Sequence, residues 1–347
     1  MKSRFYILGL LLLFVSSISF ISCETDIDVT SEWKDITIVY GLLSQNDSIH
    51  YLKINKAFLG DGNSLEYAKE PDSLNYFGNL DVTLTEVNEY GGTRTFQFDT
   101  VTVAKEEGVF ANRQLVYKSD FRMPADLIDA NSGNDKNYTY NLLIKNKTTG
   151  KEIKSSTTLV KDFSFITPRS GQPTIEFLSD KAVVKWESAK NARRYDVYIR
   201  FWFQEISQAN DTTDRYVDWT LGNVKSNTLN GGEDLSIPYL PTSFYDICNS
   251  LIPYKDAAAE SNIIARLTNK VVYTIVASGD ELNTYLDING PSSGLIQDRP
   301  EYTNIDNGLG LFSARFTKRN SIMVGSLTEG QFIALRPNLK FINKIGN

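Results

Sequence analysis

The chain contains few of the side chains on which enzymes usually rely. Its 347 residues include one histidine, His50, and two cysteines, Cys23 and Cys248. Two-histidine zinc sites, cysteine-rich metal sites and Ser-His-Asp triads are therefore excluded by count, and no glycine-rich loop precedes a Lys-Ser or Lys-Thr pair as a P-loop requires. Cys248 lies in an apolar segment and is expected to be a buried thiol. We expect no enzymatic activity, no metal and no cofactor, and a hydrolase with paired carboxylates is the alternative that counting leaves open.

Two short motifs resemble ligand-binding loops without meeting their requirements. Residues 129–135 carry oxygen ligands at alternating positions, but Asn134 stands where an EF-hand loop requires glycine and Tyr140 where it requires glutamate. We interpret this segment as a polar hairpin loop, with weak calcium binding as the alternative. Gly308-Leu309-Gly310 lies among expected strands, and there a glycine hairpin or bulge is favoured over a phosphate-binding loop.

The residue with the clearest chemistry is Cys23. Two basic residues precede an apolar run over 5–15, and a stretch of small residues follows it up to the cysteine. This order is typical of an export signal, and the run is shorter than the roughly 20 apolar residues of a transmembrane helix. Phe20-Ile21-Ser22-Cys23 resembles a relaxed bacterial lipobox, which implies a signal peptide over 1–22 and a lipid on Cys23. The alternative is an ordinary secretory signal followed by a chance cysteine.

The charge of the chain bears on its partners and its location. Lysines and arginines number 36 against 42 acidic residues, and loss of residues 1–22 would change the net charge from −6 to −8. An acidic chain of this kind argues against nucleic acid as a partner. The expected tether over 23–34 begins with the acidic segment Glu24–Asp28, which resembles the surface-export signal of Bacteroidota lipoproteins. This resemblance implies a lipid anchor in the outer membrane and exposure at the cell surface, with a periplasm-facing orientation as the alternative.

A candidate binding surface lies on a long strand expected over 195–205. Alternation along that strand separates an inward apolar row from an outward row of aromatic and arginine side chains, and a neighbouring strand adds two more aromatic residues. The candidate residues are Tyr198, Arg200, Trp202, Tyr216 and Trp219. Exposed Tyr, Trp and Arg side chains are typical anchors of protein interfaces, and the rings could also stack on sugars. The alternative is that helices or the first half of the chain cover this face as a second core layer.

The first half of the chain, residues 35–161, reads as a series of short strands. Alternation of apolar and polar residues predicts strands over 35–40, 48–54, 82–85, 94–98, 138–144 and 153–160. A polar segment that contains glycine, residues 146–151, predicts a turn between the last two. Many short strands with few helices predict an antiparallel β-sandwich.

The second half has a similar character with added helices. Residues 162–172, which contain Pro168 and Gly171, predict a linker, and residues 173–345 are expected to form a second sandwich. Trp186 followed by the long strand over 195–205 resembles a fibronectin type III or related Ig-like domain, which implies that Trp186 packs against the inward row of that strand. The other elements expected are helices over 243–251 and 257–267, strands over 270–277, 309–317 and 321–324, and a loop over 285–301.

As a whole, the chain resembles the uncharacterised two-domain surface lipoproteins of Bacteroidota, with an Ig-like first half and a fibronectin type III-like second half. The residues that carry the resemblance are Cys23 with its acidic tail and the segments 37–41, 137–140 and 302–312. Such proteins are often encoded near TonB-dependent outer-membrane transporters. The resemblance implies a non-enzymatic interaction module with a transporter as partner. A glycan-binding protein or an adhesin, including a fimbrial subunit, is the alternative, and a hydrolase is a further one.

Overall fold

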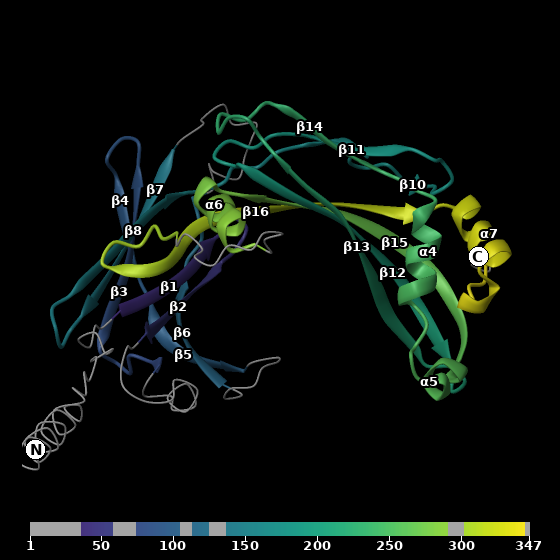
Figure 1. Cartoon of the computed structure of the whole chain (residues 1–347), viewed down its shortest axis with the longest axis horizontal. Helices are drawn as coiled ribbons and strands as arrows, with labels where there is room; N and C mark the ends of the chain where they lie inside the picture. Colours follow the sequence, from purple (N-terminus) through teal and green to yellow (C-terminus); the bar gives the residue numbers. More distant parts are fainter. Residues whose placement is uncertain (1–35, 58–73, 105–112, 125–136, 291–301, 344–347) are drawn as a thin grey trace, which may run out of the picture.

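The structure, a computed structural model, describes residues 36–57, 74–104, 113–124, 137–290 and 302–343. Within these residues the chain is mainly β, and nearly all neighbouring strands pair in antiparallel fashion, which confirms the predicted fold class. The described part forms an arch with an N-terminal lobe and a C-terminal lobe (Figure 1). None of its helices has the length and apolar character needed to cross a membrane.

One sheet of nine strands runs through both lobes, in the order β13-β12-β15-β16-β1-β2-β6-β5 with β10 beside β16. Its strands are β1 (Ile36–Leu43), β2 (Ile49–Ala57), β5 (Asp99–Ala104), β6 (Arg113–Asp120), β10 (Thr174–Ile175), β12 (Arg194–Ser207), β13 (Thr212–Lys225), β15 (Ile263–Ser278) and β16 (Gly308–Val324). Residues 308–314 of β16 pair in parallel with β1, whereas residues 315–323 pair in antiparallel with β15. Strand β16 therefore joins the two lobes.

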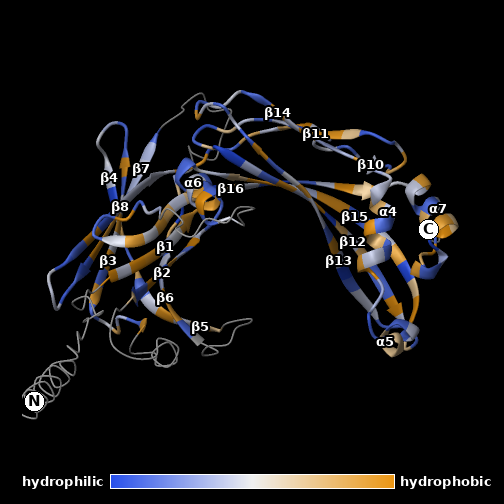
Figure 2. Cartoon of the chain, in the orientation of Figure 1, coloured by the Kyte–Doolittle hydropathy of each residue, from blue (hydrophilic) through white to orange (hydrophobic). Residues whose placement is uncertain are grey.

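A smaller sheet packs on the long sheet in each lobe. The N-terminal lobe has β3 (Leu80–Asn88), β4 (Thr93–Gln97), β7 (Tyr138–Asn146) and β8 (Glu152–Thr158), and the C-terminal lobe has β9 (Phe165–Thr167), β11 (Ala182–Glu187) and β14 (Asp234–Tyr239). Alternating burial along β7 and β12 places every second side chain in a shared apolar core. The hydrophobic residues accordingly follow the strands in both lobes (Figure 2).

The helices lie at the ends and connections of the C-terminal lobe. They are α4 (Ser243–Leu251), α5 (Ala257–Asn262), α6 (Asp280–Asn289), α7 (Ser326–Leu335) and the 3-10 turn η2 (Pro337–Leu339). Helices α4 and α7 close the far end of the arch (Figure 1), where Phe244 of α4 stacks on Phe177 with ring centroids 4.2 Å apart. The first predicted helix, over 243–251, is confirmed.

Several predicted boundaries were wrong. The helix expected over 257–267 ends at Asn262, because the chain from Ile263 onwards pairs with β12. The two strands expected over 309–317 and 321–324 are the single strand β16, whose pairing with β15 continues across residues 318–320. Part of the loop expected over 285–301 belongs to α6, and residues 291–301 lie outside the described residues.

The glycine motif at the start of β16 was also misinterpreted. Gly308 and Gly310 form neither a hairpin nor a bulge, because the parallel register with β1 runs through them without interruption. They lie opposite Thr37 and Val39 of β1, whose backbone an added Cβ atom would meet. The two glycines therefore permit the close approach of the strands that joins the lobes.

The predicted core position of Trp186 is confirmed. Its side chain is fully buried, and its ring centroid lies 5.6 Å from that of Tyr195. The segment 162–172, predicted as a linker, contains β9 and also Asp162, which accepts hydrogen bonds from Lys318 at 2.8 and 2.9 Å. The predicted domain boundaries and the Ig-like and fibronectin type III-like assignments stay predictions, and the structure adds that the two halves share one sheet.

Candidate functional site

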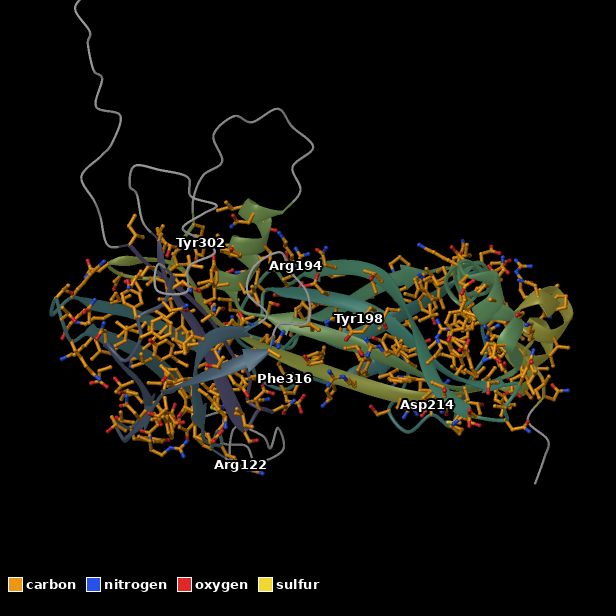
Figure 3. All side chains as sticks on the ribbon, turned by 90° about the horizontal axis from the view of Figure 1, so that it is seen from below. Arg122, Arg194, Tyr198, Asp214, Tyr302 and Phe316 are labelled. Carbon is orange, nitrogen blue, oxygen red and sulfur yellow. The ribbon has the colours of Figure 1, made fainter. Side chains whose placement is uncertain are left out.

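The outward row of β12 lies on the underside of the arch. Residues of β12 alternate in burial over its whole length, and its buried row faces β11 and β14 through the core. Tyr198, Arg200 and Trp202 belong to the opposite row and are half-buried. In the view from below, Tyr198 lies near the middle of the sheet, and Asp214 of β13 lies further towards the far end of the C-terminal lobe (Figure 3).

Strand β13 brings Tyr216 against this row. Tyr216 is the cross-strand neighbour of Trp202, with ring centroids 5.1 Å apart and an angle of 52° between the rings. The Cζ atom of Arg200 lies 3.9 Å from the centroid of the Tyr216 ring, within the range of a cation–π contact. Tyr216 itself is 49% exposed. We call Tyr198, Arg200, Trp202 and Tyr216 the aromatic–arginine face.

A bidentate ion pair holds the central arginine of this face. Arg200 Nε and Nη2 donate to the two carboxylate oxygens of Asp218 at 2.7 and 2.8 Å. These hydrogen bonds raise the pKa of Arg200. Two parallel hydrogen bonds fix the orientation of the planar guanidinium, so Arg200 presents one flat side to Tyr216. The Arg200 side chain therefore needs little rearrangement when a partner binds.

Trp219 does not belong to the aromatic–arginine face, contrary to the expectation. It lies on the opposite side of β13 and packs against the core residues Phe177, Tyr239 and Phe244, with ring centroids 5.5 to 6.5 Å apart. Positions 216 and 219 differ by three, an odd number, and residues at such a spacing point to opposite faces of a strand. The spacing alone would have separated these two aromatic residues.

Helices α4 and α7 pack on the opposite side of the sheet from the aromatic–arginine face. The buried residues of α4 contact the inward side of the sheet, as the edge-to-face packing of Phe244 on Phe201 shows. Phe332 of α7 stacks on the same inward residue at 5.8 Å. These two helices therefore build no second core layer over this face, and cover by the first half of the chain stays a prediction.

The sequence reasoning missed a second part of this sheet face. In the antiparallel register, Tyr198 lies opposite Thr274 of β15, and Thr274 lies opposite Arg319 of β16. Arg315 and Arg319 are both exposed and share one side of β16. Their alternation is visible in the sequence, but their place beside β12 depends on strand pairing and could not be read there.

Other candidate positions offer no reactive group within the described residues. Cys248 is fully buried as predicted, and burial raises the pKa of its thiol, which disfavours the reactive thiolate. Among the residues that the structure describes, no three His, Cys, Asp or Glu side chains gather as a metal site would require. Cys23 and the loop 129–135 lie outside the described residues.

A cleft of about 890 Å³ lies on the N-terminal lobe, between the outer face of β7 and β8 and residues 303–307. Its polar groups largely serve the structure: Ser155 donates to Asn304 O at 2.7 Å, and Glu281 accepts from Ser313 at 3.0 Å. The Asn304 side chain donates to the carbonyl of Phe312 and accepts from its amide. These hydrogen bonds fix the segment that leads into β16, and they leave few groups directed at a ligand.

His50 is a buried core residue rather than a catalytic one. Its ring stacks on Phe121 with centroids 4.1 Å apart, and Nε2 lies 3.3 Å from the Phe121 carbonyl oxygen. Nδ1 is buried without a hydrogen-bond partner among the described residues. A neutral ring with the proton on Nε2 satisfies this environment, and burial lowers the pKa of His50.

The stability of the protein is expected to fall as the pH drops below about 6.5, the ordinary pKa of histidine. The unfolded chain binds a proton there that buried His50 resists, so the loss amounts to at most about 1.4 kcal/mol per pH unit. Urea denaturation at pH 7.5 and 5.5 checks this for the wild type and for His50→Gln, which keeps a donor for the Phe121 carbonyl. An equally large loss in both proteins would contradict the assignment to His50.

Comparison with known proteins adds no relationship to this picture. No family model matches the chain, and no curated protein matches it. The fold and the site thus define a mainly β, two-lobed protein whose shared sheet carries an aromatic–arginine face with Tyr216 exposed.

Proposed function

We propose that this protein is a non-enzymatic lipoprotein, held in the outer membrane by a lipid on Cys23 and exposed at the cell surface, where the aromatic–arginine face binds a partner protein. An outer-membrane transporter of the TonB-dependent class is the partner that we propose. The observation that carries the proposal is the exposure of Tyr216 beside Trp202 and Arg200 on a sheet face that α4 and α7 leave free. Tyr, Trp and Arg dominate the energetic centres of protein interfaces.

The geometry favours a protein partner over a sugar. Arg200 already lies on the Tyr216 ring at 3.9 Å, and the rings of Trp202 and Tyr216 are inclined by 52°. A sugar-binding platform needs a free aromatic face on which the apolar side of the sugar can lie. The glycan-binding and adhesin alternatives are therefore less well supported, and a hydrolase lacks a supporting observation.

Cross-linked envelopes containing the wild type and two variants test the proposal. Cys23→Ala is expected to move the protein from the membrane to the soluble fraction, because the lipid that anchors it cannot be attached. Trp202→Ala combined with Tyr216→Ala is expected to stay in the membrane and to recover at least about tenfold less transporter, because anchor residues each contribute about 2 kcal/mol or more. Circular dichroism checks that the double variant is folded.

Each part of the proposal has its own contradicting result. Retention of Cys23→Ala in the membrane would exclude the lipid anchor. Undiminished recovery of the partner by the Trp202→Ala/Tyr216→Ala protein would exclude the aromatic–arginine face as the binding surface.

A further inference from the structure

A row of two exposed arginines lies beside the aromatic–arginine face, on the same side of the long sheet. Arg315 and Arg319 lie on the outward side of β16, two strands away from β12. Both are exposed, and neither has an acidic partner within the part of the chain that the structure describes. They stand apart from Arg200, whose charge Asp218 neutralises.

Two cations at the edge of this sheet face are paired with acids. Arg194 contacts Asp196 at 2.9 Å, and Lys225 contacts Asp287 at 2.6 Å. Lys270 of β15 instead lies on the same side as Arg319 and adds to its positive charge. Among the residues that the structure describes, the charges of Arg315 and Arg319 have no acidic counterpart, on a chain whose net charge is −6. Uncompensated positive charge on an otherwise acidic protein selects for a negatively charged partner, because charge complementarity steers association and disfavours other partners.

The strand between the two rows supplies an apolar floor. Val272 and Val276 of β15 are half-buried, and Thr274 between them is 2% exposed. Thr274 lies between Tyr198 and Arg319 in the register. An apolar centre with aromatic and charged residues along its margins is the arrangement found in protein interfaces.

The spacing of the rows fits an extended segment. Arg315 and Arg319 are four residues apart on one side of a strand without a register shift, so their Cα atoms are about 13 Å apart. In an extended segment, side chains four residues apart have the same spacing and direction. The rows on β12 and β16 are separated by two strand spacings, about 9.6 Å, so both lie within side-chain reach of a segment placed along β15.

Resting on the proposed function of this face, we propose that its occupant is an acidic, extended segment of the partner protein. Two carboxylates four residues apart meet Arg315 and Arg319. Apolar side chains of the segment rest on Val272 and Val276, with Tyr198 and Arg200 of β12 along its other side. Trp202 and Tyr216 lie further along β12 and β13, where they meet the continuation of the segment. The acidic residues give the interaction its specificity, and the aromatic residues supply most of the affinity.

Fluorescence anisotropy with labelled synthetic peptides tests this proposal on the full chain. The first peptide carries two glutamates four residues apart in a background of threonine and valine, and the second carries them three residues apart, on opposite sides of an extended chain. The first peptide is expected to bind at least about fivefold more tightly and to lose affinity with added salt. Arg315→Gln/Arg319→Gln is expected to weaken its binding at least about tenfold.

A matched variant separates the site from the overall charge. Arg122→Gln/Arg169→Gln also removes two exposed arginines, Arg122 being in the N-terminal lobe (Figure 3), and is expected to leave peptide binding unchanged. An equal loss in this variant, equal affinity for the two peptides, or no binding of either would overturn the proposal. Binding to phosphatidylglycerol vesicles through Arg315 and Arg319, without peptide binding, would also overturn it and point to a lipid surface. In each case the envelope experiment with Tyr216 and Trp202 still decides the proposed function independently.

Discussion

Replacing Gly310 with alanine is expected to destabilise the protein by about 3–5 kcal/mol. We expect no other added methyl group to have a larger effect. Gly310 has a φ of +112°, and an alanine Cβ there would lie 2.0 Å from the carbonyl oxygen of Val39. Neither backbone can move aside easily, because β16 is paired with β1 on one side and leads directly into its pairing with β15. The clash therefore falls on the junction of the two lobes.

Gly330→Ala is the matched control for this prediction. Gly330 lies in α7, and an added Cβ there meets no heavy atom within 4 Å. Because alanine is favoured over glycine inside a helix by up to about 1 kcal/mol, this variant is expected to be neutral or slightly more stable. Thermal melting and urea denaturation of both variants check the contrast. Melting of Gly310→Ala at the wild-type temperature would contradict the role assigned to the glycine.

The second large effect is expected from Arg266→Met. Arg266 is completely buried, and its guanidinium donates to Glu205 at 2.8 Å, to Glu260 at 2.8 and 2.9 Å and to the carbonyl of Leu339 at 3.0 Å. Burial opposes its charged form, but the carboxylates of Glu260 and Glu205 outweigh burial and raise the pKa of Arg266. These hydrogen bonds tie β12, α5 and the C-terminal segment to β15.

Glu205 is only 2% exposed in the intact protein. Without Arg266, its carboxylate would keep two hydrogen-bond partners, Arg215 and Tyr254, at 2.8 Å each. Breaking one side of a buried ion pair typically costs about 3–5 kcal/mol, and here the buried carboxylate of Glu205 would keep only one of its two arginines, Arg215. Urea denaturation should show a loss of this size. The double variant Glu205→Leu/Arg266→Met is expected to be more stable than Arg266→Met alone, because it also removes the buried carboxylate that Arg215 alone would have to compensate.

Arg200→Met provides the comparison with an exposed ion pair, on the neighbouring strand β12. The pair of Arg200 with Asp218 has the same bidentate geometry, but the two side chains are 32% and 40% exposed. Exposed ion pairs contribute about 1 kcal/mol or less, because water solvates the remaining charge. Equal losses for Arg200→Met and Arg266→Met would show that burial does not set the strength of the network.

The candidate site was only partly predictable from the sequence. The side-chain period of a strand correctly placed Tyr198, Arg200 and Trp202 on one side of β12, because alternation is a local property. The same two-residue period, applied to β13, would have placed Trp219 on the opposite side from Tyr216 and outside the site. Arg315 and Arg319 could not be placed, because nothing in their own segment shows which strand lies beside it.

The buried ion network shows a related limit. Arg266 lies in a segment that reads as the end of a helix, and a fully buried arginine there conflicts with its hydrophobic pattern. The position becomes intelligible only once Glu205 and Glu260 are brought to it by strand pairing. The burial of a charged residue thus cannot be predicted from its own segment, because it depends on charged partners far away in the sequence.

The sequence by itself determined that this protein is a mainly β chain with Trp186 in its core, one histidine and a surface row on β12. These properties follow from composition and from the alternation of neighbouring residues, which each segment carries within itself. Only the tertiary structure decided that Val39 lies against Gly310, that one sheet runs through both lobes, and that two arginine-bearing rows share one face. The neighbour of each strand and the register of their pairing depend on packing between segments far apart in the chain. The free energy of that packing cannot be computed from one segment alone.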